Sequence, residues 1–280
     1  LFGPWQNGIL GISRFSTLKS TKELKIMLSR LFRKLTSESL KTVITLVFLF
    51  VSWHLLALIL QTPALPPPWD ALKSLVAIFR SEIASHLGVS LYRVTVSLVI
   101  ATVLAVPLGL FIGKNKAADR LSAPFIYLTY PIPKVVFLPI FLILLGIGNV
   151  SKIVLITLVV FYQILVTTRD AARNLAREYV LSVKSLRASE WEIYRHVYFP
   201  ACLPAILTSM RLGLGTALAV LFLVETYATR EGIGFFIMNS WSSLAYEKMF
   251  AGIIAMSLMG FALYLLLDFC EKVLCRWVNP

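Results

Sequence analysis

The chain has 280 residues, and 58% of them are apolar, a share that is too high for an ordinary soluble domain. Its net charge of +13 could suggest a nucleic-acid ligand, but the basic residues fall between apolar runs and form no single basic surface. The three cysteines include no CxxC pair, which argues against a zinc site or a disulfide framework. The composition therefore predicts an all-α membrane protein with several spans.

The first 38 residues are basic and not apolar enough to span a bilayer. Leucines recur at helical spacing from Leu24 to Leu35, opposite a face of lysines and arginines, which predicts an amphipathic helix. This helix could lie on an anionic membrane surface or pack on the cytoplasmic ends of the spans. Residues 39–280 are then expected to form one membrane domain.

That domain contains six apolar runs that are long enough, or nearly long enough, to cross a bilayer. The spans are predicted at residues 40–60, 91–112, 124–145, 153–168, 205–226 and 249–270. An interfacial helix is expected at 69–87, and a turn with a short helix at 230–243. Pro131 and Pro133 predict a break in the third span, which is tolerated at membrane depth only against protein or water.

The distribution of Lys and Arg predicts the orientation. The segments on the same side of the membrane as the N-terminus hold 19 of these 27 residues, whereas the segments on the opposite side hold six. The basic segments are residues 1–41, 113–120, 169–204 and 271–280. The positive-inside rule therefore places both termini in the cytoplasm.

A charged island at residues 177–204 interrupts the apolar pattern. Ser189 stands three residues before Glu192, and this capping-box spacing predicts that a helix begins between them. Three aromatic residues follow at helical spacing, namely Trp191, Tyr194 and Tyr198. A solvated loop has no use for such a stripe, so the island is expected to bind a partner.

The island resembles the cytoplasmic motif of permease subunits of binding-protein-dependent ABC importers, which reads E-A-A, three residues, Gly, nine residues, I-x-L-P. Alignment on Pro200 places Phe199 on the Leu, Val197 on the Ile and Arg187 on the Gly. The E-A-A positions fall on Leu181, Ser182 and Val183. An arginine at the glycine position loses the freely accessible positive φ, at a cost of roughly 1–2 kcal/mol, unless the turn is of another type.

Other segments resemble the nitrate/sulfonate/taurine/bicarbonate branch of these permeases, and the similarity extends over about residues 89–277. They are Pro133-Lys134 with Leu138-Pro139 and Leu145–Gly148, Met210–Gly213, Glu225–Tyr227 and Gly232–Phe236. The resemblance implies the six-span fold of a type I ABC importer permease in a bacterial or archaeal inner membrane. It implies a subunit without catalysis of its own, which translocates a small anion or sulfonate; related branch members carry pyrimidine vitamin precursors.

The resemblance also implies the partners. ATPase subunits would use ATP and Mg, a periplasmic or lipid-anchored protein would deliver solute, and a second permease copy would complete the pore in the bilayer. No nucleic acid is expected. The loop at about 170–200 would be the ATPase contact, with coupling residues Leu181, Ser182, Val183, Arg187, Ser189, Trp191, Tyr194 and Pro200.

The candidate solute path consists of Tyr130, Lys134, Arg211 and Glu225. Lys134 and Arg211 are cations predicted near mid-membrane, where a charge indicates function. The alternative is structural pairing of these cations with backbone carbonyls or with Glu225.

An alternative function is an integral-membrane enzyme or an ion-coupled carrier. Either would need several intramembrane carboxylates or a His/Asp/Glu cluster, and the spans offer only Glu225 and Asp268. The run Gly109–Lys114 is a near miss to a phosphate-binding loop, with one intervening residue too few and Asn115 in place of Ser or Thr. It is interpreted as the end of a span, so any ATPase must be another subunit.

Overall fold

The computed structural model describes residues 40–227 and 229–277, and all regular secondary structure in these ranges is helical. The chain divides into two units, Leu1–Pro68 and Trp69–Pro280. In the first unit, the helix Leu40–Leu60 matches the predicted first span, and its 21 residues, most of them apolar and exposed, fit the thickness of a bilayer. The helix predicted within residues 1–38 lies outside the described residues.

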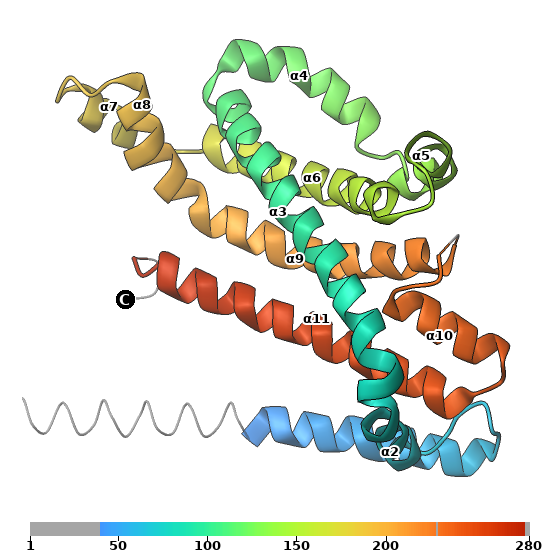
Figure 1. Cartoon of the computed structure of the whole chain (residues 1–280). Coiled ribbons are helices and arrows are strands. Elements are labelled where there is room, and N and C mark those ends of the chain that lie inside the picture. Colours follow the sequence, from blue (N-terminus) through green and yellow to red (C-terminus); the bar gives the residue numbers. More distant parts are fainter. Residues whose placement is uncertain (1–39, 228, 278–280) are drawn as a thin grey trace, which may run out of the picture. The chain divides into compact units, whose positions relative to one another are not determined.

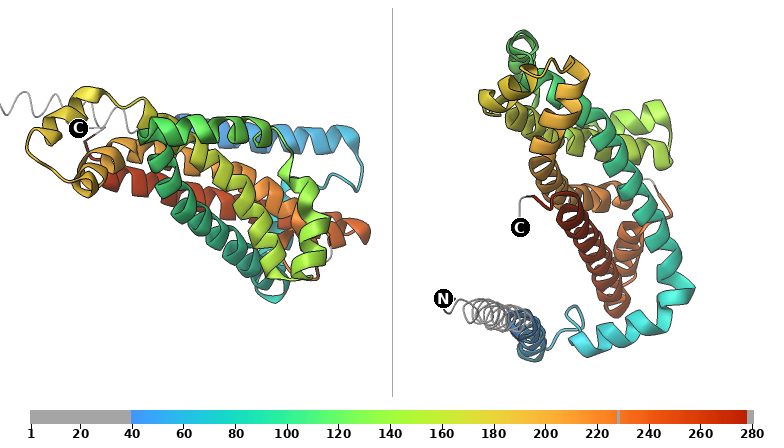
Figure 2. Two further views of the ribbon diagram at one scale, coloured as in Figure 1. Left: turned by 90° about the horizontal axis from the view of Figure 1, so that it is seen from above. Right: turned by 90° about the vertical axis from the view of Figure 1, so that its left-hand side faces the viewer.

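The second unit begins with a long bent helix. α2 (Pro68–Ile78) continues through the π-helical turn η1 (Phe79–Ile83) into α3 (Ala84–Lys114), and Figure 2 shows the chain turning between α2 and α3. The sequence predicted an interfacial helix at 69–87 and a second span at 91–112. In the structure the two are continuous, and Gly88 lies inside α3.

The third predicted span is broken, as its prolines indicated. α4 (Lys116–Thr129) is capped by the Asn115 side chain, which accepts hydrogen bonds from two backbone amides of the first turn. After the break come η2 (Lys134–Phe137) and α5 (Leu138–Leu145), and the chain bends by 78° between the two parts. α4 together with η2 and α5 is long and apolar enough to cross a bilayer as one bent span. The described residues therefore hold five candidate spans, or six with this bent pair.

The fifth span is continuous with the charged island. α6 (Asn149–Arg173) precedes the short α7 (Arg177–Lys184), and a turn leads to α8 (Glu190–Ile193). The helix then runs without interruption through η3 (Tyr194–Tyr198) into α9 (Phe199–Thr226). It forms a single 37-residue helix, Glu190–Thr226, so the island and the span are mechanically joined.

α10 (Ile233–Ser242) and α11 (Tyr246–Leu274) complete the second unit. Figure 1 shows α7 and α8 at one end of this unit and α10 at the other. Its centre is formed by α3, α6 and α9, which pack against one another. The α6 residues Leu155, Ile156, Val160 and Ile164 are fully buried there, whereas many large apolar side chains elsewhere are exposed, as a membrane-facing surface requires.

Two glycines bring α3 close to α6. A Cβ atom on Gly109 would stand 2.8 Å from the Cβ of Thr168, and one on Gly113 would stand 2.3 Å from the carbonyl oxygen of Arg169. Four-residue spacing of small residues is a common means of close helix packing in membranes. The run that nearly matches a phosphate-binding loop therefore has a packing role in α3.

Candidate functional site

The turn of the island adopts the backbone conformation that the family motif assigns to glycine. Arg187 has φ +59°, in the left-handed region, and its amide donates to the carbonyl oxygen of Lys184. Ser189 follows, and its Oγ accepts a hydrogen bond from the Glu192 amide while the Ser189 amide donates to Glu192 Oε2. The predicted capping box is confirmed. The turn is of the type that glycine suits, although the residue is arginine.

The aromatic stripe of the island is divided between two environments. Trp191 is 72% exposed, whereas Tyr198 is buried and Tyr194 is partly buried. The Lys114 Nζ lies 3.8 Å from the Tyr194 ring centroid and 5.7 Å from that of Tyr198, and it also forms an ion pair with Glu190. The tyrosines therefore attach the island to the end of α3. The sequence placed all three rings on a partner-binding stripe, and in the structure only the Trp191 ring is exposed.

The outward face of the island carries other large apolar side chains. Val183 is half-buried and packs on the core, while Ser182 is exposed and Pro200 is partly buried. Within residues 177–191, the exposed large apolar side chains, called here the outward patch, are Tyr179, Leu181, Leu186 and Trp191. Four such residues on one short segment are the feature expected of a docking surface.

We expect Arg187→Gly to stabilise the turn. The left-handed conformation disfavours any side chain by about 1–2 kcal/mol, part of which is offset by the greater freedom of glycine in the unfolded chain. Hydrogen exchange of the amides at residues 184–189 should therefore slow. The matched control is Arg195→Gly, which places glycine inside a helix and should speed local exchange, because glycine destabilises a helix interior by about 1 kcal/mol. Faster exchange in Arg187→Gly would contradict the conformation described.

Lys134 lies at the break between α4 and α5. Its Nζ donates to the Thr129 carbonyl oxygen at 2.9 Å and to that of Tyr130, and it stands 4.5 Å from the Tyr162 ring centroid and 5.3 Å from that of Tyr130. The last carbonyl groups of a helix have no partner within it, and a cation there satisfies them. The alternative of pairing with backbone carbonyls thus describes the contacts of Lys134.

Arg211 of α9 pairs with the last turns of α11. Its Nη1 lies 3.6 Å from Asp268 Oδ1, its Nη2 forms an ion pair with Glu271, and its guanidinium lies over the Tyr264 ring. The sequence placed Arg211 near mid-membrane, with Glu225 as the alternative partner. The structure gives Arg211 carboxylate partners, but they are Asp268 and Glu271 near the C-terminal end of α11 and not Glu225.

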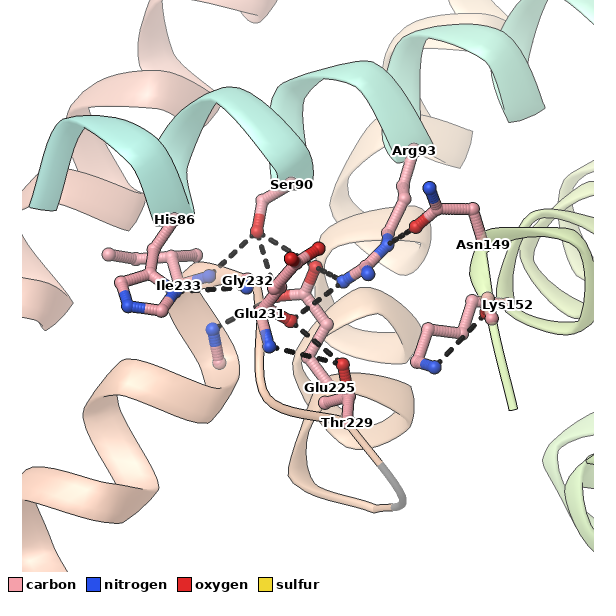
Figure 3. Close-up of polar contacts among 12 residues, drawn as sticks. His86, Ser90, Arg93, Asn149, Lys152, Glu225, Thr229, Glu231, Gly232 and Ile233 are labelled. Carbon is pink, nitrogen blue, oxygen red and sulfur yellow. Dashed lines mark hydrogen bonds and ion pairs between the residues drawn. The ribbon is translucent and has the colours of Figure 1, made fainter.

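Glu225 belongs to a buried polar network with Arg93 of α3 (Figure 3). The Glu225 side chain is 0% exposed and the Arg93 side chain 2%. Arg93 Nη1 donates to Glu225 Oε1 at 2.7 Å and to the Glu231 carbonyl oxygen at 3.0 Å, while Nε donates to Asn149 Oδ1 at 2.8 Å. Arg93 therefore joins α3 to the start of α6 and to the end of α9.

The same network holds the start of α10. The Ser90 Oγ donates to the Glu225 carboxylate and accepts from the Ile233 amide at 2.8 Å, and the Gly234 amide donates to Glu225 Oε2 at 2.9 Å. Gly232 has φ +112°, and a Cβ atom there would stand 2.3 Å from the Glu225 Cδ. Glu225 therefore lies so close to the backbone of Gly232 and Gly234 that the Cβ atom of any other residue there would collide with its side chain.

Sequence reasoning missed the role of Arg93, which it counted among the six basic residues on the side opposite to the termini. A buried Lys152 in α6 was counted in the same group; it is 1% exposed, and its Nζ donates to the Gly148 carbonyl oxygen. Ser90 and Arg93 stand three residues apart, so both face one side of α3, and this spacing is the signal that could have found them.

Comparison with known proteins decides the family. The family described as "binding-protein-dependent transport system inner membrane component" matches residues 105–279, more than half of the chain. The chain belongs to this family. The resemblance read from the island is thereby confirmed, and the matched residues include the whole of it.

Relatives within the family agree. The chain is 31% identical over 238 residues to the taurine transport system permease protein TauC of Escherichia coli, covering 82% of this chain and 86% of that protein. It is 28% identical to the putative aliphatic sulfonates transport permease protein SsuC of Bacillus subtilis, covering 72% and 73%. A chain of the MetNI methionine ABC transporter in an inward-facing conformation shares the fold, with TM-score 0.59, 18% identity and coverage of 71% of this chain and 96% of that one.

Proposed function

We propose that this chain is the membrane-spanning subunit of an ATP-driven importer for a small sulfonate of the taurine kind. The observation that carries the proposal is the 31% identity to TauC, which extends over most of both chains. The chain supplies the pathway and no catalysis. ATP binding and hydrolysis with Mg take place on separate ATPase subunits, and a periplasmic or lipid-anchored binding protein delivers the solute. Two copies of the chain form the pore.

Transport would follow from movement of the island. When the ATPases close, a segment bound to their surface is displaced, and the spans switch between outward-facing and inward-facing states. The continuous helix Glu190–Thr226 supports this, because displacement of α8 is transmitted to α9 without an intervening loop. The contact of Tyr194 with Lys114 would carry the same displacement to the end of α3.

We infer that both termini and the island lie in the cytoplasm, from the asymmetry of basic residues. In a variant without the three native cysteines, single cysteines at Ser81 and Ser242, which are both exposed, should react with an impermeant reagent in spheroplasts. A cysteine at the exposed Ser185 should react only after permeabilisation. Reaction at position 185 in intact spheroplasts would reverse the orientation and remove the island as an ATPase contact.

We expect Trp191→Asp to abolish association with the ATPase subunit. The ring of Trp191 is exposed on the outward patch, so a carboxylate there removes the apolar contact without disturbing the core. Co-purification from detergent measures the loss. Trp241→Asp, the same change on an exposed tryptophan of α10 at the other end of the second unit, should co-purify normally. Equal co-purification of both variants would show that the patch is not the contact.

Along the solute path, we assign Lys134 and the backbone carbonyl group of Tyr130, which accepts from its Nζ, to the lining, and Arg211 and Glu225 to structure. The break at Pro131 and Pro133 is the place where backbone carbonyls are free to face a polar pathway. The Lys134 Nζ donates hydrogen bonds to such carbonyl oxygens, and a passing sulfonate would replace them as its acceptor. Arg211 and Glu225 are already engaged by oppositely charged partners.

Reconstituted uptake tests the function. Proteoliposomes with the permease, its ATPase and its binding protein should accumulate labelled taurine only with hydrolysable ATP, and unlabelled alkanesulfonate should compete better than nitrate, bicarbonate or an aminopyrimidine. Lys134→Met should lower this uptake while association with the ATPase is retained. Uptake driven by an ion gradient without ATP would favour the ion-coupled carrier, and better competition by the aminopyrimidine would replace the substrate class.

A further inference from the structure

A strongly basic pocket lies at the island end of the second unit. It has a volume of about 860 Å³ and lies between the start of α4, the end of α6 and the start of α7. Its cationic lining residues are Lys114, Lys116, Arg120, Arg169, Arg173 and Arg177. Arginine, with its planar fork of donors, is the residue that recognises phosphate most specifically.

The cations of this pocket are only partly neutralised within the described residues. Asp119 pairs with Arg169 and, at 3.5 Å, with Arg173. Asp170 pairs with Arg169 at 3.6 Å, and Glu190 pairs with Lys114. These are three carboxylates against six cations.

The other three cations have no ion pair in the part of the chain that the structure describes. They are Lys116, Arg120 and Arg177. They converge from α4 and from the first residue of α7 on one concave site. An anionic ligand would remove the repulsion among them.

An apolar groove continues from the pocket along α4. It has a volume of about 780 Å³ and shares Arg120, Ala123 and Arg169 with the basic pocket. Beyond these residues, the lining becomes apolar and aromatic, with Pro124, Ile126, Tyr127, Tyr130, Pro131 and Val166. The combined surface is thus charged at one end and apolar along the rest.

We propose that this surface binds an anionic phospholipid, with its phosphate in the basic pocket and an acyl chain in the groove along α4. Charge complementarity favours the headgroup, because basic pockets between spans on the cytoplasmic side bind anionic lipid headgroups. The groove favours an amphiphile over a free anion, since a small sulfonate or phosphate gains nothing from an apolar extension. The site is expected in the cytoplasmic leaflet, where the positive-inside rule places this end.

A bound headgroup would also link three elements. Arg177 is the first residue of α7, Arg120 belongs to α4 and Arg173 ends α6. Neutralising their mutual repulsion would hold α7 against α4 and α6. The lipid would therefore set the position of the helix that begins the island.

The test uses the full-length permease in phosphatidylcholine nanodiscs that contain a minor share of phosphatidylglycerol, with bound lipid measured by native mass spectrometry. The triple variant Lys116→Gln, Arg120→Gln and Arg177→Gln removes cations without breaking a described ion pair. Its affinity for phosphatidylglycerol should fall at least tenfold. The control triple Arg187→Gln, Arg195→Gln and Arg276→Gln removes the same charge from exposed positions outside the pocket and should bind as the parent does.

A further variant separates headgroup from chain. Ala123→Phe fills the point where pocket and groove meet, and it should weaken phosphatidylglycerol binding although it removes no charge. Equal loss of phosphatidylglycerol in the pocket and control triples would overturn the proposal, because binding would follow net charge alone. Displacement of the lipid by inorganic phosphate or by taurine would overturn it too, in favour of a site for small anions.

Discussion

Replacement of Glu225 by alanine is expected to remove about 3–5 kcal/mol of stability, the usual effect of leaving one partner of a buried ion pair alone. The carboxylate accepts hydrogen bonds from Arg93, Ser90 and the Gly234 amide, and it is fully buried. Without it, the Arg93 guanidinium keeps the Glu231 carbonyl and Asn149 but loses its counter-charge. The loss should appear as a lower midpoint of thermal unfolding in detergent.

The expected loss of stability is large because the ion pair is buried, so an exposed ion pair is the proper control. Lys73→Ala breaks the pair with Asp70, whose side chain is 43% exposed, and should change stability by less than about 1 kcal/mol. The double variant Arg93→Met with Glu225→Met removes both charges and should be more stable than Glu225→Ala alone. A Glu225→Ala protein as stable as the Lys73→Ala protein would show that the network is not formed.

The second large effect is expected from Gly113→Ala. The added methyl group would stand 2.3 Å from the Arg169 carbonyl oxygen and 2.7 Å from the Ala172 Cβ, so α3 and α6 must separate. Overpacking of this kind destabilises a protein by about 1–3 kcal/mol. Because the first obstacle is backbone, no side-chain rotation can relieve it, and we expect the upper part of that range.

The matched control lies in the same helix. Gly88→Ala adds the same methyl group where nothing lies within 4 Å, and alanine is preferred over glycine in a helix by about 1 kcal/mol. Thermal unfolding in detergent should therefore show a higher midpoint for Gly88→Ala and a lower one for Gly113→Ala. Two midpoints that move in the same direction would contradict the close packing of α3 on α6.

The sequence by itself determined the features that depend on neighbouring residues. The length of an apolar run sets where a helix can cross a bilayer, and it placed the spans. Pro131 and Pro133 remove backbone donors wherever they stand, and they placed the break. Ser189 and Glu192 cap a helix through bonds between residues three apart, and they placed the start of α8. The sequence did not show that residues 69–87 and 91–112 join in one continuous bent helix.

Only the tertiary structure decided which groups meet across the chain. Glu225 was assigned to the solute path until Arg93, 132 residues earlier, proved to be its partner. Tyr194 and Tyr198 shared the spacing of Trp191, and it is the position of Lys114 at the end of α3 that turns the two tyrosines inward. The sequence alone did not show whether Gly109 and Gly113 lie in a loop or in a helix contact, and in the structure both pack against α6. These outcomes depend on which helices pack together, and a local sequence pattern does not show which distant residue will face it.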